Sequence, residues 1–144
     1  MSYAISGMCK ILPHVQYRHP GYPADHPLVP HGISVALPAP AVFRLTGPAA
    51  PQRHIAAAQA LGADVSRVAS DDGEHAGAVL ADTVLGIMQR LDVPLGLSHL
   101  GYRPGDVPSL VAGTLPQERV TKLAPLPATA EVLEHLFATS MSYS

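Results

Sequence analysis

The sequence predicts an all-α protein, and three observations predict it. Apolar residues recur three and four positions apart in several segments, as on one face of a helix. Capping residues and prolines divide these segments into roughly five to seven helices. Convincing strand-like alternation of apolar and polar residues is missing. With 144 residues, of which 47% are hydrophobic, the chain can bury one core, as one domain or as a fragment of a larger protein.

The first predicted helix covers residues 2–12, where four apolar residues stand three or four positions apart: Ile5, Met8, Cys9 and Leu12. It begins without an N-cap signal, like the tail of a longer helix. Cys9 is the single cysteine, so an internal disulfide is impossible and a reducing compartment is favoured. We expect Cys9 to be a small buried apolar side chain rather than a reactive thiol.

A proline-rich segment, HPGYPADHPLVPHG, follows the first helix. Because proline fixes φ and has no amide donor, we expect an irregular loop between Pro13 and Pro30. The next segment, HGISVALPAPAVFRLTG at residues 31–47, is nearly all apolar. It predicts a buried helix that is bent at Pro38 and Pro40.

Two helices are predicted in the middle of the chain. The first is alanine-rich and ends at Gly62, which suits a left-handed C-terminal cap. Asp71 or Asp72 can cap the second and longest helix. Its predicted core face consists of five apolar residues: Leu80, Val84, Ile87, Met88 and Leu91.

Two more helices are predicted toward the C-terminus. Asp106 provides a cap and Pro108 a first-turn proline for a short helix. The last helix begins near Thr129. Its apolar side consists of four residues: Val132, Leu133, Leu136 and Phe137.

Composition excludes several classes of function. The net charge is -2, the nine Lys and Arg residues are scattered, and 5% of residues are aromatic, so a nucleic-acid surface is not expected. No apolar run approaches the roughly 20 residues that span a bilayer, and no signal peptide is recognisable. We therefore expect a soluble, intracellular protein. The nucleotide-binding glycine motifs, the zinc-protease motif and the serine-hydrolase elbow are all missing.

Eight histidines raise the possibility of a metal site. Four stand alone and are expected to be ordinary hydrogen-bonded or solvated imidazoles: His54, His75, His99 and His135. The others lie in the proline-rich region, and His19, Asp25, His26 and His31 could form an independent metal site. His31 is the strongest candidate ligand, because Pro30 and Gly32 would present it rigidly at the start of a helix.

Two long strings point to a family. DHPLVPHGISVALPAPAVF, at residues 25–43, and GTLPQERVTKLAP, at residues 113–125, closely resemble the hydroxyacid-oxoacid transhydrogenase branch of the iron-containing alcohol dehydrogenases. The resemblance runs nearly from end to end. It implies that residues 1–144 are the C-terminal metal-binding helical domain of the iron-containing alcohol dehydrogenase and dehydroquinate synthase-like fold. The N-terminal dinucleotide-binding domain of that fold would then be absent.

The resemblance also implies a site. In that family one aspartate and three histidines hold Fe²⁺, sometimes zinc, beside NAD. His31 corresponds to the last of these histidines, while the other three ligands would precede Met1. Tyr3 corresponds to a position in the wall of the nicotinamide pocket, although an ordinary packed tyrosine is an equal alternative. No catalytic residue is assigned to this chain, and we expect it to retain neither metal nor NAD alone.

The resemblance implies that the complete enzyme oxidises 4-hydroxybutyrate to succinic semialdehyde while it reduces 2-oxoglutarate to 2-hydroxyglutarate. Whether the chain alone is an enzyme stays open. One alternative is a non-catalytic helical module, and another is one half of a split enzyme that binds a separate dinucleotide-binding chain. We expect it in the cytoplasm of a bacterium or the mitochondria of a eukaryote.

Overall fold

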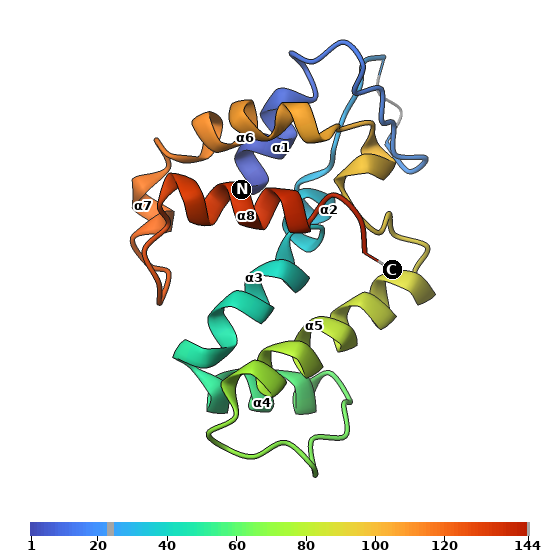
Figure 1. Cartoon of the computed structure of the whole chain (residues 1–144). Helices are drawn as coiled ribbons and strands as arrows, with labels where there is room; N and C mark the ends of the chain where they lie inside the picture. Colours follow the sequence, from blue (N-terminus) through green and yellow to red (C-terminus); the bar gives the residue numbers. More distant parts are fainter. Residues whose placement is uncertain (23–24, 144) are drawn as a thin grey trace. The chain divides into compact units, whose positions relative to one another are not determined.

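The computed structural model describes residues 1–22 and 25–143, which form helices and connecting loops (Figure 1). Within these ranges the β-structure amounts to an isolated bridge between Arg18 and Leu28, so the all-α prediction is confirmed. None of the described helices combines the length and the apolar character needed to cross a membrane. Pro23 and Ala24, part of the predicted proline-rich loop, lie outside the described residues.

The described residues form eight α-helices and three short 3-10 helices. The α-helices are α1 (Ser2–Met8), α2 (His31–Ala36), α3 (Ala39–Thr46), α4 (Pro51–Ala60), α5 (Gly73–Arg90), α6 (Val107–Thr114), α7 (Glu118–Thr121) and α8 (Ala130–Thr139). The 3-10 helices are η1 (Gly47–Ala49), η2 (Leu97–Leu100) and η3 (Pro104–Asp106). The predicted number of α-helices was too low for two reasons. The segment that was predicted as one helix forms two helices, and α7 is too short to show an apolar period.

The predicted bent helix over residues 31–47 is the one that is divided. It forms α2 and α3, with Leu37 and Pro38 between them. Pro38 and Pro40 cannot donate the amide hydrogen bonds that a continuous helix directs to the carbonyls four residues earlier. The loss of two donors so close together ends α2 instead of bending it.

The first helix is shorter than predicted, since α1 ends at Met8. The next four residues form a tight turn in which the Leu12 amide donates to the Met8 carbonyl at 2.9 Å. Pro13 disfavours helical backbone at Leu12, so the helix ends ahead of it. Cys9 in this turn is 2% exposed, which confirms the expectation of a buried side chain.

The chain forms two compact units, one from Met1–Pro38 together with Pro94–Ser144, and one from Ala39–Val93. In the first unit α6 packs against α1 and α8, and α2 packs against α1. Gly113 lets α6 approach α1 closely, because a Cβ atom there would lie 3.3 Å from the Cβ atom of Ala4. The core of this unit includes Ile5, Leu97, Leu110 and Phe137.

The last helix of the first unit, α8, agrees with the sequence prediction. Thr129 caps it, since the Thr129 hydroxyl accepts a hydrogen bond from the Val132 amide at 3.3 Å. Leu133, Leu136 and Phe137 are buried. The apolar period of this segment therefore identified both the helix and its packed face.

In the second unit α5 packs against α3, α4 and η1. The predicted cap of α5 is confirmed at Asp72, whose carboxylate accepts from the His75 amide at 3.0 Å. Glycine makes the close packing possible. A Cβ atom at Gly77 of α5 would lie 2.6 Å from the carbonyl oxygen of Phe43 in α3, so a larger residue would force the two helices apart.

The buried face of α5 differs from the predicted stripe. Leu80 and Met88 are buried as expected, but Leu91 is 69% exposed because it stands at the C-cap, past the last helical turn. The buried residues are largely small: Gly73, Ala76, Gly77, Leu80, Ala81, Leu85 and Met88. Small side chains let the backbones of neighbouring helices approach closely. A sequence pattern of large apolar residues therefore does not identify this face of α5.

Helices α4 and α5 end in the same left-handed geometry. Gly62 has a φ of 92°, and the amide after it, of Ala63, donates to the Ala58 carbonyl at 3.0 Å. This arrangement is a Schellman cap and confirms the prediction for Gly62. Asp92, with a φ of 54°, takes the equivalent position after α5.

Candidate functional site

His31 lies at the start of α2 and is exposed to solvent. Pro30 precedes it with φ −56° and ψ 144°, so the chain arrives extended and turns into the helix at the histidine, as the Pro-His-Gly sequence predicted. The described residues form no hydrogen bond to either ring nitrogen of His31. The imidazole is therefore available to a ligand from outside this chain.

Two hydroxyl groups, one buried and one partly exposed, stabilise the first turn of α2. Ser34 is fully buried, and its hydroxyl donates to the His31 carbonyl at 2.8 Å. Ser6 of α1 lies 3.0 Å from the Ser34 hydroxyl oxygen and can donate to it. Because these groups leave little freedom to the backbone, α1 holds His31 at a defined place.

Tyr3 is the neighbour of the His31 side chain. The two ring centroids lie 5.6 Å apart with an interplanar angle of 35°, and Tyr3 is 46% exposed. Tyr3 is therefore not an ordinary core tyrosine. The structure brings together the two residues that the sequence singled out, although they are separated by the whole proline-rich loop.

Arg119 of α7 joins this pair, and sequence reasoning missed it. Its guanidinium carbon lies 5.7 Å from the centroid of the Tyr3 ring, within the range of a cation–π contact. Arg119 stands within the string GTLPQERVTKLAP, but no spacing links it to the N-terminal residues. We call the cluster of Tyr3, His31 and Arg119 the imidazole cluster.

The other histidines of the proline-rich region have partners of their own. His26 lies 2.6 Å from the carboxylate of Asp25, and His19 accepts a hydrogen bond from the Gly21 amide at 3.0 Å. Among the described residues no three His, Cys, Asp or Glu side chains form a group that could hold a metal ion. Among the described residues, His19, Asp25, His26 and His31 are therefore not brought together as the independent metal site that the sequence suggested.

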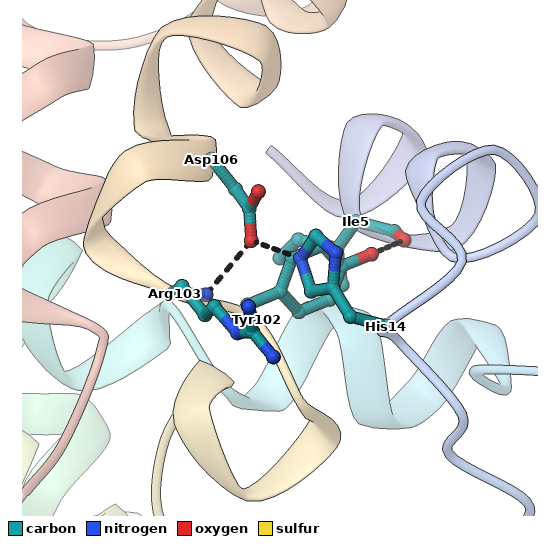
Figure 2. Close-up of polar contacts among 5 residues, drawn as sticks. All are labelled: Ile5, His14, Tyr102, Arg103 and Asp106. Carbon is teal, nitrogen blue, oxygen red and sulfur yellow. Dashed lines mark hydrogen bonds and ion pairs between the residues drawn. The ribbon is translucent and has the colours of Figure 1, made fainter.

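His14 forms a different kind of contact, shown in Figure 2. Its Nε2 atom lies 2.8 Å from Oδ2 of Asp106, which also accepts a hydrogen bond from the Arg103 amide at 2.8 Å. The predicted helix cap is thus corrected, because Asp106 precedes α6 but its carboxylate makes no capping bond to that helix. It points back to Arg103 and His14 instead.

Opposing effects act on the carboxyl group of Asp106. Burial disfavours the charged form and raises its pKa, whereas the hydrogen bonds from His14 and from the Arg103 amide lower it. The hydrogen bonds prevail, and the pKa of Asp106 lies below its ordinary value. The contact between His14 and Asp106 involves no residue of the imidazole cluster.

The imidazole cluster contains one side chain that could bind a metal ion, His31, and not a complete metal site. Structural and catalytic sites for first-row metals need three or four protein ligands, and His31 belongs to no group of three or more His, Cys, Asp or Glu side chains among the described residues. His31 nevertheless has the properties of a metal-binding imidazole. Its side chain is exposed, its backbone is held by the Ser34 hydroxyl, and the described residues form no hydrogen bond to its ring. Any further ligands must come from outside the described residues.

The model of the family described as Fe-containing alcohol dehydrogenase family, C-terminal, matches residues 26–141. The human mitochondrial hydroxyacid-oxoacid transhydrogenase is 51% identical over 98% of this chain and 28% of its own length. The Xenopus laevis protein of that name is 50% identical over 98% of this chain and 29% of its own. The probable hydroxyacid-oxoacid transhydrogenase of Dictyostelium discoideum is 47% identical over 99% of this chain and 25% of its own.

The chain thus spans less than a third of the length of each of these relatives, and it matches each of them along nearly all of its own length. No solved structure matches the chain.

Proposed function

The chain belongs to the Fe-containing alcohol dehydrogenase family, of which it matches the C-terminal domain, and we propose that it is the metal-ligand-bearing helical part of a hydroxyacid-oxoacid transhydrogenase. In the complete enzyme, His31 would be one of the ligands of a divalent iron or zinc ion. A dinucleotide-binding part, in the same protein or in a separate chain, would supply the other ligands and bind NAD.

One observation carries this proposal. The histidine of the Pro-His-Gly sequence, in a chain about half identical to those transhydrogenases, stands exposed at a helix start, and the described residues form no hydrogen bond to its ring nitrogens. Most histidines in this fold have hydrogen-bonding or ionic partners, such as Asp106 for His14 and Asp25 for His26. An exposed imidazole on a rigid support is suited to bind a metal without reorganisation.

In the complete enzyme, the residues around His31 would position its imidazole and shield the site from water. The Ser6 and Ser34 hydroxyls hold the backbone of His31, so that its imidazole is positioned before any ligand arrives. Tyr3 would close one side of the site and exclude water from the nicotinamide. In such an enzyme a bound metal ion supplies polarisation of the substrate oxygen, and the nicotinamide supplies hydride exchange.

The proposed reaction couples two half-reactions. 4-Hydroxybutyrate would be oxidised to succinic semialdehyde and 2-oxoglutarate would be reduced to 2-hydroxyglutarate, and a bound nicotinamide would supply the hydride exchange between the two half-reactions. The relatives are named as mitochondrial proteins, which supports a mitochondrial location if the source is a eukaryote. We expect the isolated chain to turn over neither substrate, because one imidazole binds metal weakly.

Metal analysis tests the proposal. The chain is purified alone and together with the dinucleotide-binding part, and metal content is compared for wild type, His31→Ala and His99→Ala. His99 is an exposed histidine of the same compact unit and serves as the control. We expect stoichiometric metal only in the assembled protein, lost in His31→Ala and kept in His99→Ala.

Two results would refute the proposal. One is metal binding by the assembled protein that survives His31→Ala. The other is turnover of 4-hydroxybutyrate by the isolated chain, which would require a complete site within it. A separate dinucleotide-binding chain that copurifies would identify the enzyme as a split one.

A further inference from the structure

We infer that Arg119 binds the carboxylate group of the substrate and so selects hydroxy acids over plain alcohols. This inference rests on the proposed function, since it assumes that the substrate oxygen lies at a metal held by His31. It assigns a role to a residue of the short helix α7 that motif analysis left without one.

The position of Arg119 relative to His31 supports this role. The guanidinium carbon of Arg119 and the ring of His31 lie 5.7 and 5.6 Å from the same Tyr3 ring centroid. Because both distances end at the same centroid, the guanidinium carbon of Arg119 and the ring centroid of His31 lie at most about 11 Å apart. In 4-hydroxybutyrate three C–C bonds of about 1.5 Å separate the carbon of the hydroxyl end from the carboxylate carbon, so one molecule can reach from a metal at His31 toward Arg119.

Among the described residues, no carboxylate forms an ion pair with Arg119. The ion pairs of the described residues include those of Arg44 with Asp82 and of Lys122 with Glu118, and Arg119 takes part in neither. The adjacent carboxylate, of Glu118, is engaged by Lys122 at 2.5 Å. Arg119 therefore has a cation–π contact and no carboxylate, which leaves its hydrogen-bond donors free for an anionic ligand.

Helical geometry separates Arg119 from that ion pair. Glu118, Thr121 and Lys122 share one side of the α7 turn and line a cavity of about 560 Å³ together with the loop that follows. Arg119 does not line this cavity and faces Tyr3 instead. The two cations of this segment thus point to different surroundings, and only Arg119 belongs to the imidazole cluster.

The chemistry of the guanidinium group suits a carboxylate. It is planar and always charged, and it can donate two parallel hydrogen bonds to the two oxygens of a carboxylate. The Tyr3 ring would restrict the orientation of the guanidinium plane and so lower the entropy lost on binding. Both substrate classes in the name of the relatives, hydroxy acids and oxo acids, carry this group.

The test compares two alcohols of equal carbon number in the complete enzyme. 4-Hydroxybutyrate carries the carboxylate, whereas 1,4-butanediol replaces it with a second hydroxyl. For Arg119→Gln we expect kcat/KM for 4-hydroxybutyrate to fall about tenfold to a hundredfold, mainly through KM, while kcat/KM for the diol stays within about twofold. Arg119→Lys should fall between, because it keeps the charge but loses the paired geometry.

Lys122→Gln is the matched control, since it removes one positive charge from the same segment without touching the imidazole cluster. It should leave the ratio of the two substrates unchanged. An Arg119→Gln enzyme that loses activity on both alcohols equally, or on neither, would overturn the inference while the proposed function stands. A wild-type complete enzyme that oxidises neither alcohol would overturn the proposed function, and this inference with it.

Discussion

The Nε2 atom of His14 lies 2.8 Å from Oδ2 of Asp106, although 92 positions separate the two residues in the sequence. This contact joins the proline-rich loop to the segment that leads into α6. Gly101, with a φ of 97°, lies close to the same loop, and a Cβ atom there would be 2.9 Å from the His14 carbonyl oxygen. The loop is therefore held by specific contacts despite its irregular backbone.

Replacement of Asp106 by Asn should weaken this connection. The variant loses the charged acceptor of two hydrogen bonds, and we expect the free energy of unfolding at pH 7 to fall by about 1–3 kcal/mol in urea titrations. Asp82→Asn is the control, because Asp82 pairs with Arg44 at an exposed site and its loss should cost less than about 1 kcal/mol.

The effect of Asp106→Asn should also depend on pH. Because the pKa of Asp106 is lowered in the folded state, its contribution to stability is present above the unfolded pKa and is lost as the pH falls through the folded pKa. The stability difference between wild type and variant should therefore shrink below about pH 4. A difference that grows on acidification would contradict this assignment.

Tyr102→Phe should destabilise the first unit. The hydroxyl group of Tyr102, a residue that is 2% exposed, donates to the carbonyl of Ile5 in α1. Its loss should cost about 1–2 kcal/mol of unfolding free energy with an unchanged dependence on urea. Burial raises the pKa of Tyr102, so its contribution should be present below about pH 10 and lost at higher pH, where the two proteins converge.

Two glycines of α5 should respond oppositely to alanine. Gly77→Ala places a methyl group 2.6 Å from the Phe43 carbonyl oxygen and should cost about 1–3 kcal/mol. Gly86→Ala meets only the end of the Arg90 side chain at 3.5 Å and should stabilise by about 0.5–1 kcal/mol. Thermal unfolding of both variants checks this, and equal melting temperatures would be inconsistent with the close packing of α3 on α5.

Asp92→Gly should raise stability. Asp92 has a φ of 54° after α5, a conformation that costs an L-residue roughly 1 kcal/mol and a glycine almost nothing. Asp92→Ala is the informative companion, because it removes the same carboxylate but keeps the Cβ atom. We expect a higher melting temperature for the glycine variant than for the alanine variant, and the reverse order would rule out backbone strain as the cause.

Local signals in the sequence predicted the local features of the fold. Asp72, Thr129 and Gly62 mark helix ends through bonds or torsions within a few residues, and such signals can be read without tertiary structure. The prediction for α5 failed at Leu91 because an apolar residue beyond the last turn continues the period without entering the core.

The candidate site could be predicted only in part. His31 was recognisable because Pro30 and Gly32 flank it, but its contact with Tyr3 depends on how α2 packs against α1. Arg119 could not be found, since a lone arginine on a short polar helix resembles any solvated residue. The same holds for His14 and Asp106, whose contact exists only once distant segments have packed.

The order of segments in the two compact units has a kinetic consequence. The unit of residues 39–93 is continuous, so all of its chain is available once Val93 has left the ribosome. The unit that contains His31 needs residues on both sides of that stretch, and closing such a long loop costs chain entropy before any contact forms. During synthesis, residues 39–93 can therefore become ordered first. The unit that contains His31 can be completed only after α6, α7 and α8 have been synthesised.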